Sequence, residues 1–160
     1  MRRLAILCVG LPALAMLAGC QPPVRTVGPV DQITMFVATT PVFLDAEPGP
    51  DGVRVSSLYF FQESHPEPVA VNGTLEFLLF EGVVSSSRVL SSKPMHVWTF
   101  SGNDLAPHMG RDRLGVKYSF VLPWGQVVPT AETVTLAARY QPKGGAWVHA
   151  APVSVVLTGD

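Results

Sequence analysis

The sequence predicts an all-β protein, an antiparallel β-sandwich of about seven strands. Residues 116–122 and 133–140 each alternate apolar and polar side chains with a period of two, the pattern of a half-buried strand. Fifteen prolines and fourteen glycines are spread over the chain and interrupt any long helical pattern. Short apolar segments recur between turn-forming clusters, roughly every ten residues, as expected of a sandwich.

Seven segments are rich in β-branched and aromatic residues and are separated by clusters of Pro, Gly, Ser and Asp. We predict strands over residues 33–44, 53–62, 69–81, 94–100, 116–122, 133–140 and 147–158. Pro41 interrupts the first strand, and the Pro, Gly and acidic residues of 45–52 form a loop. Asn72-Gly73 suits a type I′ turn, which leaves open a division of the third strand into two.

The alternation also predicts which side chains point into the core. The inward set is Val116, Tyr118, Phe120, Leu122, Val134, Leu136, Ala138, Tyr140, Val153, Val155 and Leu157. Between the fourth and fifth strands, Asn103 or Asp104 is placed to cap one helical turn before Pro107. Because the sequence contains no amphipathic helix, the succession of seven short strands favours a sandwich of the immunoglobulin or fibronectin type III kind. The Cys-Trp-Cys core of antibody domains is absent from the sequence.

The first twenty residues have the organisation of an export signal. Arg2 and Arg3 precede a fifteen-residue apolar segment, 4–18, which is short for a permanent membrane span. It ends in Leu17-Ala18-Gly19-Cys20, which resembles the lipobox of bacterial lipoproteins. The resemblance implies that the Cys20 thiol takes a diacylglyceryl group and that cleavage before Cys20 frees an amine for further acylation. Two or three acyl chains then make membrane attachment lasting.

These features divide the chain into a signal peptide, 1–19, a lipidated tether, 20–31, and a β-sandwich domain, 32–160. An ordinary secretory signal cut near Ala13, Ala15 or Ala18 is the alternative. Gln21 is not acidic, and by resemblance to lipoprotein sorting this favours the outer membrane, with the domain facing the periplasm or the cell surface. The mature domain is similar in general pattern to immunoglobulin-like lipoproteins of bacterial envelopes.

Composition excludes several classes of function. No cysteine follows Cys20, so the domain has neither disulfides nor a cysteine metal cluster. The precursor has a formal net charge of −1, and loss of Arg2 and Arg3 leaves 9 basic and 12 acidic residues. That balance gives no basic patch for nucleic acid.

The histidines, His65, His96, His108 and His149, have no zinc-ligand spacing. Met95-His96 and His108-Met109 combine thioether and imidazole, a copper-type ligand set, and leave a metal site as an alternative if the two pairs converge. The prediction is no metal and no cofactor. No GxSxG nucleophile elbow exists, the serines at 85–87 suit a polar loop, and no catalytic residue is predicted.

The densest polar cluster is the segment 101–115, which contains His108, Arg111, Asp112 and Arg113. As a binding loop it would recognise a carboxylate or phosphate through its arginines. A solvent-facing loop with ion pairs inside the loop is the favoured interpretation. Among the tryptophans, we expect Trp98 in the core and Trp124 and Trp147 as lids over the ends of the sandwich.

The sequence therefore predicts a membrane-anchored envelope lipoprotein, held by lipid at Cys20, whose β-sandwich is a non-catalytic interaction or structural module. Its expected partner is an envelope protein, not a nucleic acid. A periplasmic metal or small-ligand binding protein is the first alternative. A hydrolase is the second, and it would need a nucleophile within reach of a histidine.

Overall fold

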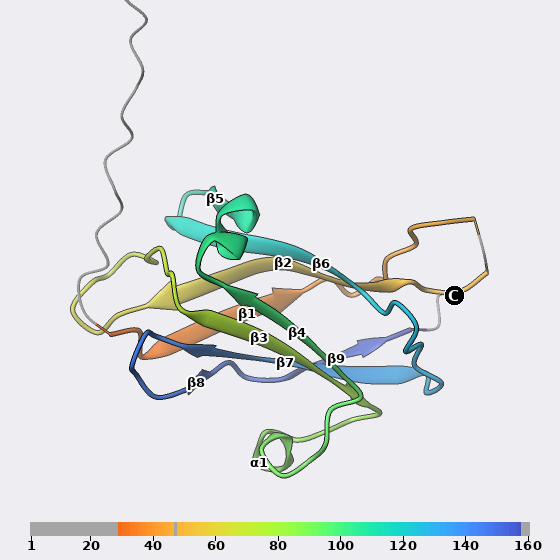
Figure 1. Cartoon of the computed structure of the whole chain (residues 1–160). Helices are drawn as coiled ribbons and strands as arrows, with labels where there is room; N and C mark the ends of the chain where they lie inside the picture. The colour runs from red at the N-terminus through yellow and green to blue at the C-terminus, as the bar shows by residue number, and fades with distance from the viewer. Residues whose placement is uncertain (1–28, 47, 158–160) are drawn as a thin grey trace, which may run out of the picture.

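Two antiparallel sheets pack face to face in a computed structural model that describes residues 29–46 and 48–157 (Figure 1). The first sheet has the strand order β1 (Gln32–Val37), β2 (Gly52–Phe61), β6 (Val116–Pro123), β5 (Met109–Arg111). The second has the order β4 (His96–Ser101), β3 (Thr74–Glu81), β7 (Thr133–Gln141), and both β8 (Val148–His149) and β9 (Val153–Val156) pair with β7. Two short helices, α1 (Ser86–Val89) and the 3₁₀ helix η1 (Gly102–His108), complete the domain. The all-β sandwich prediction is confirmed.

The strand count differs from the predicted seven. β5 has only three residues and includes Gly110, so it carries no detectable alternation, and the last predicted strand divides around Pro152 into β8 and β9. The predicted signal, 1–19, and the predicted lipidation site, Cys20, lie outside the described residues. None of the helices within 29–46 and 48–157 is long and apolar enough to span a membrane.

The third predicted strand was placed too early, and its Asn72-Gly73 hairpin is wrong. β3 begins at Thr74, and the preceding segment crosses from one sheet to the other with Val69 and Val71 buried. Gly73 has no positive φ; instead, a Cβ there would lie 2.1 Å from the carbonyl oxygen of Gln141. Glycine is needed for close approach to β7, not for a turn.

The core lies between the sheets, where the predicted alternation places it. All the inward residues of 116–122 and 133–140 are buried, as are Val155 and Leu157, while Val153 is half-buried. Two buried tyrosines bond the crossing segment: Val71 N–H donates to the Tyr118 hydroxyl at 2.9 Å, and Gly73 N–H donates to that of Tyr140 at 3.0 Å. Burial raises the pKa of both tyrosines.

β7 is buried on both faces, which the sequence did not predict. Its outer face supports a second apolar cluster of Leu78, Phe80, Val89 and Ala137 beneath α1. The continuous burial along 134–138 fits a central strand that is covered on both sides.

The strands run between two ends of the sandwich (Figure 1). We call the end where β1 begins the near end, because the predicted tether would enter there. The connections 62–73, 112–115 and 142–147 lie at this end. The connections 38–51, 82–95 and 124–132 leave the strands at the opposite end, the far end, and the middle of 82–95 folds back so that α1 covers the outer face of β7 (Figure 1).

Candidate functional site

The predicted binding loop is largely regular structure. η1 begins after Ser101, whose N–H donates to the Asp104 carboxylate at 3.3 Å, and β5 follows directly. The predicted cap at Asn103 or Asp104 is therefore wrong, because Ser101 takes the N-cap position and Pro107 lies inside the helix.

His108 packs against aromatic side chains at one side of the sandwich. Its ring stacks on Phe120 with centroids 4.3 Å apart and planes at 26°, and it meets the edge of Phe100 at 5.1 Å. Its Nδ1 lies 3.1 Å from the carbonyl oxygen of Ser119. Packing against two aromatic rings and a backbone bond gives His108 a structural role.

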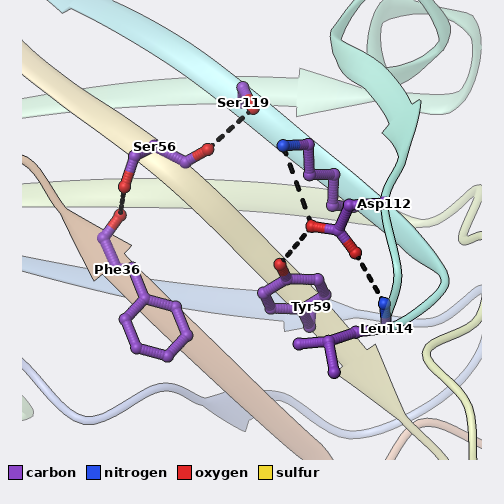
Figure 2. A network of polar contacts seen from close by, with 7 residues as sticks. Phe36, Ser56, Tyr59, Asp112, Leu114 and Ser119 are labelled. Atoms are coloured by element: carbon purple, nitrogen blue, oxygen red, sulfur yellow. Dashed lines mark hydrogen bonds and ion pairs between the residues drawn. The ribbon is translucent and has the colours of Figure 1, made fainter.

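Asp112 belongs to a separate polar network (Figure 2). Its carboxylate accepts hydrogen bonds from the Tyr59 hydroxyl at 2.6 Å and from Leu114 N–H at 2.9 Å, and Lys117 Nζ lies 3.8 Å away. The Tyr59 hydroxyl lowers the pKa of Asp112, and the same bond raises the pKa of Tyr59. The network ties the turn between β5 and β6 to β2.

The ion pair expected inside the loop is instead made to Lys117 on β6. Arg111 and Arg113 are exposed, and neither guanidinium has an ion-pair partner among residues 29–46 and 48–157. Of the four predicted residues, His108 is packed against aromatic rings and Asp112 belongs to a polar network. Arg111 and Arg113 face the solvent.

A shallow hollow of about 430 Å³ lies on the outer face of the first sheet, beside Arg54, Ser56, His108 and Ser119. The Ser119 hydroxyl donates to the Ser56 carbonyl at 2.9 Å, and the Ser56 hydroxyl donates to the Phe36 carbonyl at 3.0 Å (Figure 2). The register shift in β2 between Val55 and Leu58 leaves the Ser56 carbonyl available to Ser119. Both serine hydroxyls therefore donate within the protein.

The histidine and methionine pairs do not form one cluster. The ring of His96 packs on Trp98 at 4.3 Å, whereas His108 packs on Phe120. Met95 packs against the core and Met109 is 44% exposed. In the described part of the chain, no three His, Cys, Asp or Glu side chains are grouped so that they could hold a metal ion.

The hydrolase alternative requires a nucleophile beside a histidine. Ser86 and His149 line one open hollow of about 320 Å³, together with small apolar residues. The described structure contains no hydrogen bond between these two side chains.

The tryptophans differ in burial. Trp124 is 1% exposed and its indole N–H donates to the Pro50 carbonyl at 2.9 Å, so it forms the expected lid, at the far end. Trp147 is half-buried under the Arg139 guanidinium, 4.4 Å from the ring centroid. Trp98 is half-buried rather than in the core, and its indole N–H donates to Pro123 at 3.1 Å.

Exposed apolar side chains concentrate at the far end. Of the twelve large ones among the described residues, five lie at the far end, in the three connections there, against Leu114 alone in the near-end ones. Leu90, also on the connection 82–95, lies instead over the outer face of the second sheet, beside Ala138 and His149. Phe43, Leu44, Val127 and Val128 form what we call the far-end apolar surface, and their exposed fractions range from 40% to 60%. Leu44 and Val128 line one hollow of about 230 Å³ with Trp124.

Hydrogen bonds to Asp51 hold the first far-end connection, 38–51, in place. The Asp51 carboxylate accepts the N–H groups of Leu44 and Asp45, and its backbone carbonyl accepts Trp124 N–H at 2.7 Å. The segment that presents Phe43 and Leu44 is therefore fixed to the end of β6.

The other two connections are fixed in a similar way. The Glu81 carboxylate accepts the hydroxyl and N–H of Thr130 and the N–H of Ala131. These bonds, that of the Thr130 hydroxyl above all, lower the pKa of Glu81. The Thr135 hydroxyl donates to the Gly82 carbonyl at 2.8 Å and accepts Val84 N–H at 3.0 Å.

The far-end apolar surface was not predicted from the sequence. The signal was present in the paired apolar residues Phe43-Leu44 and Val127-Val128. Phe43-Leu44 falls within the predicted strand 33–44, which in the structure ends at Val37, before Pro41. Among known proteins, no family model, curated protein or solved structure matches the chain.

Proposed function

We propose that the protein is a lipid-anchored lipoprotein of the bacterial envelope whose sandwich binds another envelope protein through the far-end apolar surface. Lipid on Cys20 holds the near end to a membrane, in keeping with the lipobox-like Leu17-Ala18-Gly19-Cys20. The module acts by binding and not by catalysis. The outer membrane is the proposed location.

One observation carries the binding proposal: apolar side chains are exposed on connections that side-chain hydrogen bonds hold in place. Contiguous exposed apolar patches on a folded domain mark interaction sites, whereas apolar side chains scattered singly do not. Loops fixed before binding lose less conformational entropy when a partner docks, which favours affinity. Asp51 and Glu81 supply that fixation here.

The strand order supports an immunoglobulin-type assignment of the sandwich. The order β1-β2-β6-β5 against β4-β3-β7 with β8 and β9 corresponds to strands A, B, E and D facing C′, C, F and G. In such sandwiches, binding loops cluster at one end of the two sheets. The connections equivalent to the B–C and F–G loops, 62–73 and 142–147, lie at the near end, so the far-end apolar surface occupies the opposite end and its binding role rests on its exposed side chains alone.

Site-specific photocrosslinking in the bacterium of origin tests the binding proposal. A benzophenone side chain at Phe43 or Val128 should give a discrete adduct with one protein, and the same group at Arg113 on the near end should not. Leu44→Glu should remove the adduct from position 43. Equal adducts from both ends, or none from the far end, would refute the proposed surface.

The anchor is tested separately with Cys20→Ala. The variant should accumulate as unprocessed precursor or leave the lipid-linked pool. An unacylated wild-type N-terminus in mass spectrometry, with normal membrane retention of the variant, would exclude lipidation.

A further inference from the structure

β4 is an edge strand whose outer hydrogen-bonding groups have no neighbouring strand in the described structure. Gly102 N–H donates to the Gly73 carbonyl at 3.1 Å, and the register with β3 continues without a shift from that pair. Because bonding alternates along an antiparallel ladder, Phe100 and Trp98 bond to β3, and Val97 and Thr99 turn their N–H and C=O groups outward.

The edge of β4 also lacks the usual protection against pairing. His96–Ser101 contains no proline, no charged residue and no bulge, and its residues favour β-structure. Val97 is 42% exposed and Thr99 is exposed. Elsewhere in the described sheets, β5 is three residues long, β8 and β9 are short, and β1 has a register shift at Phe36.

Charged residues at the two ends of β4 indicate which strand would pair with its free edge. The exposed Lys93 precedes the strand and the exposed Asp104 follows it, with a neutral strand between them. An antiparallel strand that complements this edge must carry a basic residue before it and an acidic residue after it. β4 itself has that arrangement.

We propose that β4 pairs antiparallel with β4 of a second copy of this chain, across a two-fold axis at Thr99. The outward-bonding residues then match Thr99 with Thr99 and Val97 with Ser101, whose N–H exchanges its 3.3 Å bond to Asp104 for the Val97 carbonyl of the other copy. The Asp104 carboxylate, in the first turn of η1, is thereby released at the end of the interface where Lys93 of the other copy lies. The interface is isologous, so it closes as a dimer. Facing threonines on paired strands are a favourable cross-strand pair. The inference goes beyond the proposed partner binding and does not depend on the lipid anchor.

Disulfide trapping tests the pairing in cells that express the full chain. Directly bonded residues on antiparallel strands have Cα atoms about 5.5 Å apart, within disulfide range. Thr99→Cys should therefore give a band of twice the monomer mass that reducing agent abolishes. Val97→Cys is the matched control, because residue 97 faces 101 and not itself, and the wild type sets the background from Cys20.

Co-expression adds a positional test. Val97→Cys and Ser101→Cys chains should crosslink to each other when co-expressed, and neither should do so alone. Strong crosslinking of Val97→Cys alone would overturn the antiparallel register, and failure of Thr99→Cys to crosslink would overturn the pairing.

A proline tests the interface without cysteines. Thr99→Pro removes an N–H that points away from β3, a position at which edge strands tolerate proline. The detergent-solubilised variant should have half the wild-type protein mass in sedimentation analysis. Val156→Pro, on the opposite edge of the same sheet, should remain dimeric. A dimer that survives Thr99→Pro would refute the proposal.

Discussion

Trp124 should be the residue on which both the stability of the far end and the position of its connections depend. Its side chain is buried, packs near Trp98 with ring centroids 6.4 Å apart, and bonds the Pro50 carbonyl. Trp124→Ala removes the whole indole from a closed site. Large-to-small changes of an aromatic residue in a core cost about 3 to 5 kcal/mol, so we expect a loss of about 4 kcal/mol in the free energy of unfolding.

Trp124→Phe separates packing from hydrogen bonding. The variant keeps an aromatic ring but loses the bond to Pro50, which contributes about 1 kcal/mol. With a smaller ring in the same site, we expect a total loss of about 1 to 2 kcal/mol. Phe43→Ser, which removes an exposed side chain from the same end, should change stability by less than about 0.5 kcal/mol.

Urea unfolding followed by circular dichroism gives these free energies for the three variants and the wild type. Trp124→Ala should also weaken the photocrosslink from position 43, because the segment 43–51 loses its indole partner. A loss below about 1 kcal/mol for Trp124→Ala would refute the conclusion that this residue closes the far end. Equal losses for Trp124→Ala and Trp124→Phe would assign the effect to the hydrogen bond alone.

Three further predictions address other contacts. The Tyr59–Asp112 bond lowers the pKa of Asp112 and raises that of Tyr59, so its stabilisation is complete between about pH 4 and pH 10 and is lost below and above that window. The stability difference between wild type and Tyr59→Phe, measured by urea unfolding across pH, should shrink at both extremes; a constant difference would contradict the assignment. Thr135→Val should cost about 1 to 3 kcal/mol, because it leaves Val84 N–H and the Gly82 carbonyl without the buried hydroxyl, and thermal unfolding would show this. Gly73→Ala should cost about 1 to 3 kcal/mol through its clash with the Gln141 carbonyl, whereas Gly110→Ala, whose Cβ would meet nothing closer than 4.0 Å, should be neutral; equal stabilities would contradict the close approach.

Strand prediction succeeded where one face of a strand is buried. β6 and the ends of β7 show period-two alternation because their inner side chains meet the opposite sheet. Strand prediction failed where the burial of a residue depends on contacts with residues distant in the sequence, or where a strand is very short. Val69 and Val71 are buried although they lie outside any strand, and β5 is too short to carry a period. Apolar content alone does not separate a strand from a buried crossing segment.

The polar network could not be predicted for a related reason. Asp112 lies next to two arginines in the sequence, yet its hydroxyl partner, Tyr59, is 53 residues away. The sheet order brings β2, β6 and the turn after β5 together, and no spacing in the sequence encodes that order. The composition of residues 101–115 identified the polar cluster. The tertiary structure determines that Asp112 pairs with Tyr59 and Lys117 and not with the neighbouring arginines.

The two proposals constrain each other through the tether. Antiparallel pairing of β4 places the near ends of two copies at opposite ends of the dimer, while the predicted tether, residues 20–31, spans at most about 40 Å when fully extended. If both Cys20 residues enter one membrane, the strands of the dimer must lie along the membrane plane and not perpendicular to it. The two far-end apolar surfaces then face sideways in opposite directions, so each dimer offers two binding surfaces to partners in the same membrane layer. Shortening the tether should leave the Thr99→Cys crosslink intact if the dimer lies flat, and should abolish it if the domains stand upright.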